Sequence, residues 1–224
     1  VPCGLVGASM GSSPHLAIAH GSDVRLLARL PGKGALLRGL SRRRSGLLLT
    51  SEALRGPLAR ATWSADRRTA RVIEEAPVER MGIHVPELRD AEQRAAAPGA
   101  RPRLLYLGRL VPEKGVGVLL EAAAALRQAV EVVIVGDGPE RAALEERARS
   151  LGLRARFLGT CLGPRKWAEL RRADLFVAPS RILPDGRQDS APVVLLEALA
   201  AGLPVVAGRV GGIAALLPPR TTGM

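Results

Sequence analysis

Aromatic residues are scarce in this chain. Its 224 residues include two Trp, one Tyr and two Phe, so leucine, valine and alanine must fill any core. The two cysteines, Cys3 and Cys161, are too few for a disulfide scaffold and suit a reducing compartment. The sequence has no run of about 18 apolar residues and no signal-peptide pattern, so we expect a cytoplasmic protein without a membrane-spanning helix.

Positive charge is what the chain has in excess. Lysine and arginine total 33 against 21 acidic residues, which gives a net charge of +12. This balance predicts an anionic partner: nucleic acid, a phosphorylated small molecule or an acidic membrane surface. For part of this excess of basic residues, a bias in amino-acid composition without any binding partner is an equal alternative. Apolar residues at 47% and charged residues at 24% indicate a globular protein.

The second half of the chain alternates short apolar runs with helical stretches. The expected strands are 104–107, 132–135, 156–158, 174–177 and 204–207. The expected helices are 115–127, 139–151, 164–172 and 192–201, with Pro139 in a first turn and Gly152 as a C-terminal cap. The alternation predicts a doubly wound parallel α/β sheet, which binds ligands at the carboxyl ends of its strands.

The first half is less regular. Residues 15–19 and 47–49 are expected strands, and a helix is expected to start near Ser51. Residues 85–103 are polar and rich in Pro and Ala, which is typical of a linker. The roughly 85 residues before it hold too few strands for a complete α/β domain.

Asp189 and Glu197 lie at a predicted helix start. Ser190 can cap a helix that opens near Pro192, and the free N–H groups of its first turn form an anion site. A carboxylate on each side of that site suits a ligand whose hydroxyl groups flank a phosphate. Glu197 sits in the apolar run 193–200, where an unpaired carboxylate is costly. We therefore favour a functional role for both carboxylates. The alternative is that Asp189 is a surface acid and Glu197 a solvated helix residue.

Arg109 and Lys114 lie in the loop that follows the expected strand 104–107. A guanidinium group can fork onto phosphate oxygens, and an ammonium group acts as a point charge. The loop is therefore a candidate phosphate site. The alternative is a pair of solvated loop cations.

Gly136 and Gly138 follow the expected strand 132–135 in a Gly-x-Gly pattern. Arg141 stands where a dinucleotide fingerprint has its third glycine, so an NAD site is rejected. A tight turn that lets a ligand approach the backbone fits the two glycines better.

His20 follows the expected strand 15–19 beside a glycine, where an imidazole can exchange a proton near neutral pH. A hydrogen bond to its own loop is an equal alternative. No group of His, Cys, Asp and Glu has metal-ligand spacing, which predicts no structural metal.

Together these motifs resemble the retaining GT-B glycosyltransferases of family 4, the glycosyl transferases group 1, closest to exopolysaccharide and colanic-acid-type enzymes. The matching segments are HGSD (20–23), SEALR (51–55), VERMGIH (78–84), YLGRLVPEKG (106–115), VVIVGDGPE (132–140), FLGT (157–160), ADLFVAPSR (173–181) and DSAPVVLLEALAAGLPVVAGRVGGI (189–213). The resemblance implies two Rossmann-like domains: a partial acceptor-side domain at 1–85, a linker at 86–103 and a nucleotide-sugar domain at 104–224. It also implies an internal fragment of a longer transferase.

The resemblance also assigns roles. Arg109 and Lys114 would hold the donor diphosphate, and the backbone of Ala191, Pro192, Val193 and Val194 would meet the sugar and phosphate. Glu197 would bind the nucleotide ribose, Asp189 the hydroxyl groups of the donor sugar, and His20 would face the transferred sugar. Gly136 and Gly138 would lie near the nucleotide. Two positions depart from the family pattern: Asp189 replaces the usual Glu, and His84 stands where the family usually has Asp.

The implied reaction transfers a sugar, with retention, from a UDP- or GDP-sugar to a lipid-linked or saccharide acceptor, without a cofactor or an essential metal. Residues 25–44 interleave basic side chains with leucines and could rest on the anionic inner face of the plasma membrane; a solvated helical face is an equal alternative. A non-catalytic anion- or nucleic-acid-binding module is a second hypothesis. Scarce aromatics and the lack of a nucleic-acid-binding motif oppose nucleic acid as a partner. A GT-B-fold epimerase or phosphorylase is the third.

Overall fold

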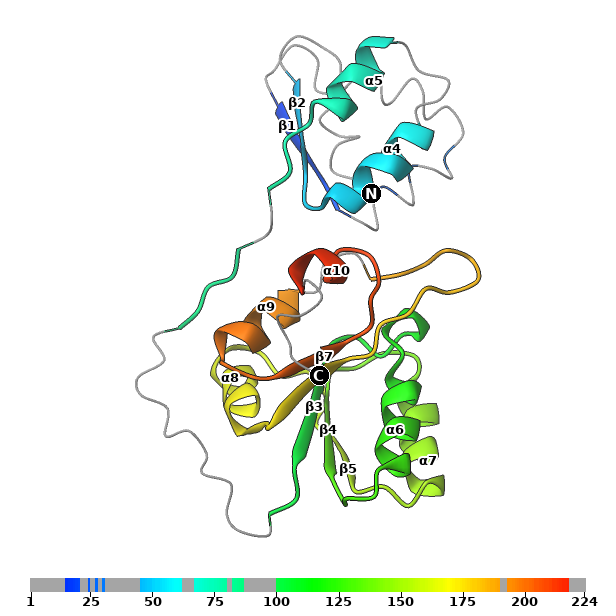
Figure 1. The fold of residues 1–224 in the computed structure, drawn as a ribbon, viewed down its shortest axis with the longest axis vertical. Helices are drawn as coiled ribbons and strands as arrows, with labels where there is room; N and C mark the ends of the chain where they lie inside the picture. The colour runs from blue at the N-terminus through cyan, green and yellow to red at the C-terminus, as the bar shows by residue number, and fades with distance from the viewer. Residues whose placement is uncertain are drawn as a thin grey trace. The chain divides into compact units, whose positions relative to one another are not determined.

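In the computed structural model, the chain forms two compact units, Val1–Gly82 and Ile83–Met224 (Figure 1). The described residues are 15–20, 24, 27, 30, 45–61, 67–79, 82–86, 100–189 and 193–217. Most of the predicted linker at 86–103 falls outside these ranges, and so does most of the basic stretch 25–44.

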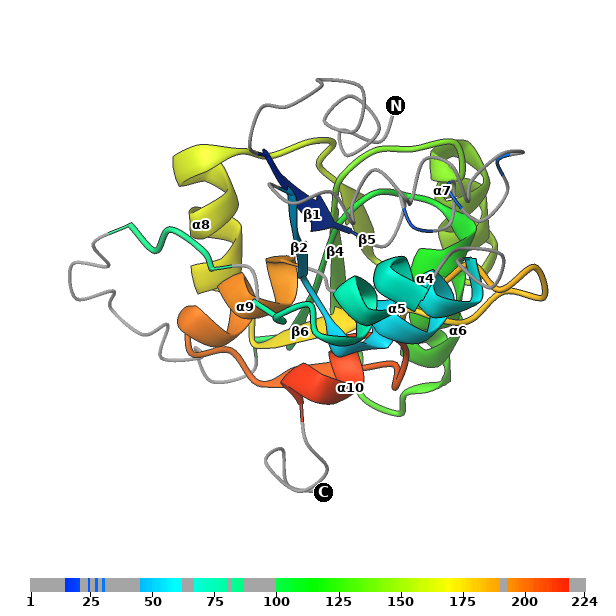
Figure 2. The same ribbon diagram turned by 90° about the horizontal axis from the view of Figure 1, so that it is seen from above.

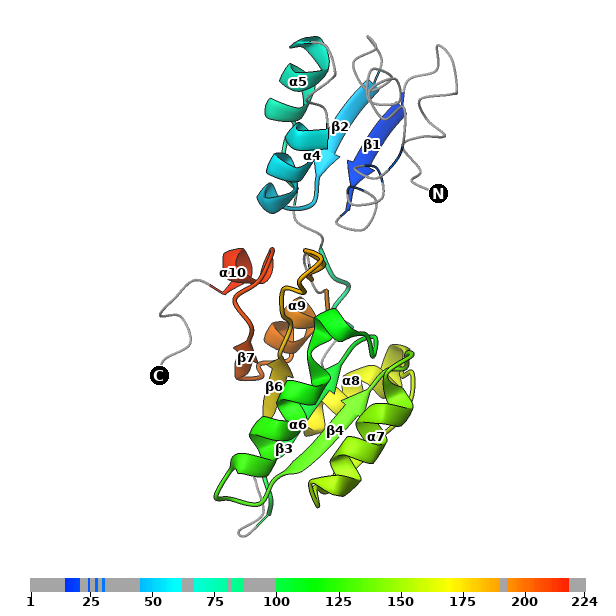
Figure 3. The same ribbon diagram turned by 90° about the vertical axis from the view of Figure 1, so that its right-hand side faces the viewer.

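In its described residues, unit 1 packs the two helices α4 and α5 and the 3-10 helix η2 on a pair of strands. Its elements are β1 (His15–Ala19), β2 (Ser45–Leu49), the 3-10 helix η2 (Glu52–Leu54), α4 (Arg55–Ala61) and α5 (Arg67–Glu74). The strands are parallel, and Leu49 forms a further parallel bridge to Val78. Figure 3 shows α4 and α5 on one face of the strands, and Leu49, Leu58 and Ile73 are buried in the unit's core.

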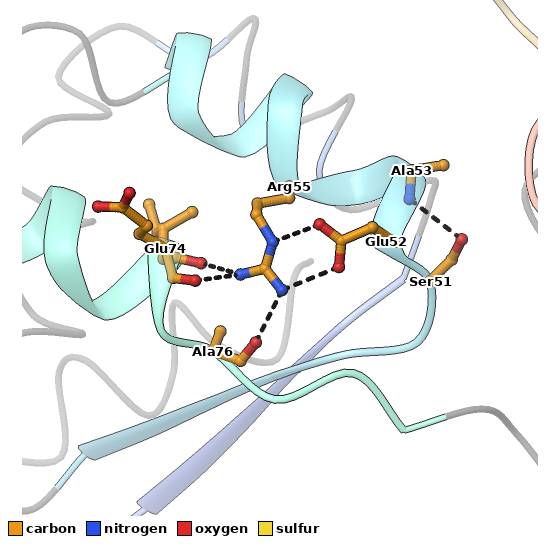
Figure 4. Close-up of polar contacts among 7 residues, drawn as sticks. Ser51, Glu52, Ala53, Arg55, Glu74 and Ala76 are labelled. Carbon is orange, nitrogen blue, oxygen red and sulfur yellow. Dashed lines mark hydrogen bonds and ion pairs between the residues drawn. The ribbon is translucent and has the colours of Figure 1, made fainter.

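Arg55 ties these elements together (Figure 4). Its Nε and Nη2 donate to the two carboxylate oxygens of Glu52 at 2.5 and 2.9 Å. Its Nη1 donates to the carbonyls of Ile73 and Glu74 at 2.6 and 2.7 Å, and Nη2 also donates to the carbonyl of Ala76 at 3.0 Å. All five guanidinium N–H groups are thereby used.

Unit 2 is a five-stranded parallel sheet covered on both faces. Its strands are β3 (Arg103–Leu107), β4 (Glu131–Val135), β5 (Ala155–Phe157), β6 (Leu175–Ala178) and β7 (Val205–Ala207). Its helices are η3 (Pro112–Lys114), α6 (Val116–Ala125), α7 (Arg141–Ser150), α8 (Gly163–Arg172), α9 (Val193–Ala200) and α10 (Ile213–Leu216). The strand order is β5-β4-β3-β6-β7.

Two cores lie on opposite faces of this sheet. Figures 1 and 2 show α6 and α7 on one face and α8 and α9 on the other. Along β3, Leu104 and Tyr106 belong to the core with α6 and α7, whereas Leu105 and Leu107 belong to the core with α8 and α9. This alternation is the two-residue period of a strand, with both faces apolar because both are covered.

The predicted strands of unit 2 are confirmed to within one residue, and the predicted helices to within two. Gly152 follows α7 with a φ of 64°, as a C-terminal cap requires. The placement of Pro139 was wrong: α7 begins at Arg141, and Pro139 lies in the turn before it. In unit 1 the strand at 15–19 is confirmed, and the one predicted at 47–49 begins two residues earlier. The helix expected near Ser51 begins as η2, with the Ser51 hydroxyl accepting from the Ala53 amide at 3.3 Å.

Candidate functional site

The strand order of unit 2 creates a switch point between β3 and β6. The chain leaves β3 through α6 on one face of the sheet and leaves β6 toward α9 on the other face. Ligands of doubly wound sheets bind in the crevice outside the carboxyl ends of such neighbouring strands. The loop after β3, residues 108–115, and the loop after β6, residues 179–189, meet at this point.

Backbone contacts fix the two loops against each other. The amide of Arg181 donates to the carbonyl of Glu113 at 3.0 Å, and Nε of Arg181 donates to the carbonyl of Pro112 at 3.1 Å. Gly115 has a φ of 65°, and a Cβ there would lie 2.1 Å from the carbonyl oxygen of Pro179. Glycine is therefore required at 115 for both its backbone conformation and the approach of the second loop.

Lys114 and Asp189 meet at the switch point, 75 residues apart in sequence. The Lys114 ammonium group donates to Asp189 Oδ2, and the Ser180 hydroxyl donates to the same oxygen at 3.2 Å. The side chains of Lys114 and Asp189 are 15% and 11% exposed. Both side chains are thus half-buried and paired with each other. The surface-acid alternative for Asp189 and the solvated-cation alternative for Lys114 were therefore wrong.

Tyr106, on β3, contacts the loop that follows this strand. It is 2% exposed, and its hydroxyl donates to the carbonyl of Arg109 at 2.8 Å. Burial, and then the negative charge of Asp189, raise the pKa of Tyr106 above its ordinary value. The hydroxyl therefore remains a donor. The Arg109 side chain is exposed, so its predicted contact with a diphosphate stays a prediction.

Glu197 is buried on α9, as predicted, with its side chain 9% exposed. Its partner was missed: Nζ of Lys166, on α8, donates to Glu197 Oε1 at 2.5 Å. The same Nζ lies 5.7 Å from the ring centroid of Trp167. The sequence held one pattern that could have drawn attention to Lys166, namely the rarity of lysine.

Gly136 and Gly138 have a structural reason to be glycine. A Cβ at Gly136 would lie 1.8 Å from the carbonyl oxygen of Gly108, and one at Gly138 would lie 2.4 Å from that of Leu110. The amide of Leu110 also donates to the carbonyl of Asp137 at 2.9 Å. The loop after β4 is thus joined to the loop after β3, and the predicted contact with a nucleotide stays a prediction.

The structure says less about the remaining predicted site residues. Val193 and Val194 are half-buried in the first turn of α9, whereas Ala191 and Pro192, with the capping Ser190, lie outside the described residues. His20 is exposed and follows β1 in unit 1, so its role toward a donor sugar stays a prediction.

The described residues hold neither a candidate metal centre nor a membrane-spanning helix. They contain no group of three or more His, Cys, Asp or Glu side chains that could hold a metal ion. They also contain no helix that is long and apolar enough to cross a membrane.

Comparison with known proteins decides the family. Residues 101–224, more than half of the chain, match the family described as glycosyl transferases group 1. The chain belongs to this family. The matched region contains both carboxylates and both lysines described above.

This chain spans about a third of the length of the curated relatives that it matches. The GDP-mannose-dependent alpha-(1-6)-phosphatidylinositol monomannoside mannosyltransferase of Mycobacterium tuberculosis is 36% identical over 132 residues, which cover 56% of this chain and 34% of the relative. The amylovoran biosynthesis glycosyltransferase AmsK of Erwinia amylovora is 35% identical over 162 residues, which cover 67% of this chain and 38% of the relative.

Solved structures confirm the predicted GT-B fold. HepE of Anabaena, crystallised with UDP and glucose, has a TM-score of 0.65 and 22% identity, covering 96% of this chain and 58% of HepE. WaaG, a glycosyltransferase involved in lipopolysaccharide biosynthesis, has a TM-score of 0.60 and 22% identity, covering 90% of this chain and 58% of WaaG.

Proposed function

We propose that this chain is part of a glycosyltransferase that moves a sugar, with retention, from a nucleotide-diphosphate sugar to a lipid-linked or saccharide acceptor in cell-surface polysaccharide or glycolipid synthesis. The observation that carries the proposal is the half-buried Lys114–Asp189 pair at the switch point, inside the region that matches the family. It brings a cation for phosphate and an acceptor for sugar hydroxyl groups to the place where such sheets bind ligands.

The relatives support this choice of reaction. A phosphatidylinositol mannoside mannosyltransferase, an amylovoran transferase and a teichuronic acid transferase of Bacillus subtilis are all similar to this chain. Their names describe glycolipid and polysaccharide synthesis, and one states a GDP-mannose donor. HepE was crystallised with UDP, so either a UDP- or a GDP-sugar is compatible with the fold.

Lys114 and Arg109 would stabilise the leaving diphosphate. An ammonium group has three N–H donors, and Lys114 gives one to Asp189, so the same group can also donate to a phosphate oxygen. Arg109 can fork onto a second oxygen. Negative charge grows on the diphosphate as the glycosidic bond breaks, and removal of one preorganised donor costs about 3 kcal/mol, or roughly a hundredfold in rate. These protein cations would take the place of a metal ion.

The two carboxylates and His20 would hold the sugar side. Asp189 would accept from the hydroxyl groups of the donor sugar, and Glu197 from the ribose. The backbone of Ala191, Pro192, Val193 and Val194 would approach the sugar and phosphate, and Gly136 and Gly138 the nucleotide. His20 would face the transferred sugar. The acceptor would be reached at the inner face of the plasma membrane, with residues 25–44 on the anionic lipid surface.

Calorimetric titration of the chain with UDP, GDP and their sugars tests the proposal. We expect one nucleoside diphosphate to bind far more tightly than its nucleoside. In Lys114→Met that preference should fall at least tenfold, because a charge-assisted phosphate contact is lost. The matched control is Arg127→Met, an exposed cation just after α6. Failure of the wild-type chain to bind any nucleoside diphosphate would refute the proposal, and salt-sensitive DNA binding in its place would favour a nucleic-acid module.

A second assay separates the transferase from other GT-B-fold enzymes. The chain, supplied with a donor that it binds, should release nucleoside diphosphate only when an acceptor is present. Isomerisation of the donor sugar without an acceptor would indicate an epimerase instead.

A further inference from the structure

Lysine is rare in this chain. Of the 33 basic side chains only Lys33, Lys114 and Lys166 are lysines, and the other 30 are arginines. Lys33 lies outside the described residues. Each of the other two donates to one member of the pair Asp189 and Glu197. The two lysines of the described residues therefore both contact the candidate ligand-binding carboxylates.

Both residues of the Lys166–Glu197 contact are fixed by their surroundings. Glu197 lies on α9 between the fully buried Leu195 and Ala198, so its backbone is fixed in the core. Lys166 lies on α8 with its side chain 19% exposed, beside the ring of the buried Trp167. Of the two carboxylate oxygens, Oε1 receives the ammonium group at 2.5 Å, and Oε2 has no hydrogen-bond partner in the part of the chain that the structure describes.

The choice of lysine has a physical consequence at this position. A guanidinium group can pair with a carboxylate in a fork that uses both oxygens, as Arg55 does with Glu52 in unit 1. An ammonium group is a point charge that occupies one oxygen. Lysine thus keeps Glu197 paired in a buried position while one oxygen stays available to accept from a ligand.

We propose that Lys166 is a positioning residue of the nucleotide site: its ammonium group fixes Glu197 through Oε1 and so directs Oε2 toward a ribose hydroxyl group of the donor. This inference rests on the proposed function, which gives Glu197 the ribose. The inference adds two statements to the proposed function. The pair Lys166 and Glu197 together recognises the ribose, and lysine is required at position 166.

The test compares the ribose preference of three chains. Binding of UDP and GDP and of their 2′,3′-dideoxy forms is measured by calorimetry for the wild type, Lys166→Met and Lys166→Arg. We expect the wild type to prefer the ribose form by about tenfold, as one hydrogen bond to a charged group predicts. Both variants should lose most of that preference while binding the dideoxy form as the wild type does. Arg165→Met, an exposed cation on the same helix, is the control and should leave the ratio unchanged.

The arginine variant separates positioning from a structural role. If the pair only neutralises Glu197, Lys166→Arg keeps the charge and should show the wild-type ribose preference, which would overturn the inference. A general loss of folding would weaken both ligands alike and leave the ratio as it was, which also counts against it. A wild-type chain that binds no nucleoside diphosphate would refute the proposed function and this inference together. A chain that binds the diphosphate but ignores the ribose would refute this inference alone.

Discussion

At the residue scale, two glycines with nearly the same backbone conformation differ in what surrounds them. Gly115 has a φ of 65° and Gly152 a φ of 64°, so a side chain is strained at either position. Only Gly115 also faces another backbone, because a Cβ there would lie 2.1 Å from the Pro179 carbonyl oxygen. Around Gly152 there is no described heavy atom within 4 Å of such a Cβ.

We therefore expect Gly152→Ala to lower the free energy of unfolding of unit 2 by about 1–2 kcal/mol, the cost of a left-handed conformation. Gly115→Ala should cost at least about 3 kcal/mol, since the clash forces the two loops of the switch point apart. Urea unfolding followed by circular dichroism measures both values. Equal losses in the two variants would contradict the close approach of the loops.

At the element scale, unit 1 depends on one side chain that joins its helices. Arg55 donates to Glu52 in η2 and to three carbonyls at and just after the end of α5 (Figure 4). The parallel bridge between Leu49 and Val78 follows shortly after these carbonyls. Arg55 thereby fixes the path by which the chain leaves α5 and joins the strands.

Replacing Arg55 by lysine should lower the stability of unit 1 by about 1–3 kcal/mol, because an ammonium group cannot reach Glu52 and three carbonyls together. Amide hydrogen exchange in β2 and α5 measures the change. The matched control is Arg71→Lys, since the one side-chain contact of Arg71 within the described residues is an exposed pair with Glu75 at 2.7 Å. Similar exchange rates in both variants would show that Arg55 does not join the elements.

The same contact predicts a pH dependence. The hydrogen bond from Arg55 lowers the pKa of Glu52 below its ordinary value of 4.5. A lowered folded-state pKa means that the stabilisation is present above the unfolded pKa and is lost as pH falls through the folded value. Protection of β2 and α5 should therefore decline below about pH 4.5, and Glu52→Gln should reduce this decline. An identical profile in the variant would contradict it.

At the scale of the whole molecule, the candidate site explains little of the net charge of +12. Lys114 and Lys166 are each neutralised by a carboxylate, and Arg109 is the further cation of the site that we propose for a phosphate. The largest block of unassigned charge is the stretch 25–44, for which we propose an anionic membrane surface. Basic residues near such a surface contribute about 1 kcal/mol each and are screened by salt.

Binding to phosphatidylglycerol vesicles tests this assignment. Changing Arg42, Arg43 and Arg44 together to glutamine should weaken co-sedimentation at least tenfold, and salt should weaken the wild type in the same way. The control changes three exposed arginines of unit 1 to glutamine, namely Arg60, Arg67 and Arg68. Equal losses in both triple variants would show a general effect of charge rather than a membrane-binding segment.

Much of unit 2 could be predicted without the structure, because its strands are continuous apolar runs and its helices are bounded by proline and glycine. The burial of Glu197 followed from its apolar neighbours. The contact of Lys166 with Glu197 was missed because it depends on packing between α8 and α9, which local periodicity does not encode. The glycines of the loop after β4 were interpreted through a ligand, whereas the contact visible in the structure is with the loop after β3.

The sequence by itself determined the succession of strands and helices, the scarcity of aromatic side chains and the excess of positive charge, since all three depend on composition and local pattern. Only the tertiary structure decided which side chains meet. Lys114 and Asp189 are 75 residues apart, and Lys166 and Glu197 are 31 apart. The first pair meets because β6 lies beside β3, and the second because α8 and α9 cover the same face of the sheet. Both contacts depend on how crossover connections arrange distant segments in the sheet. The spacing of residues along the sequence does not encode this arrangement.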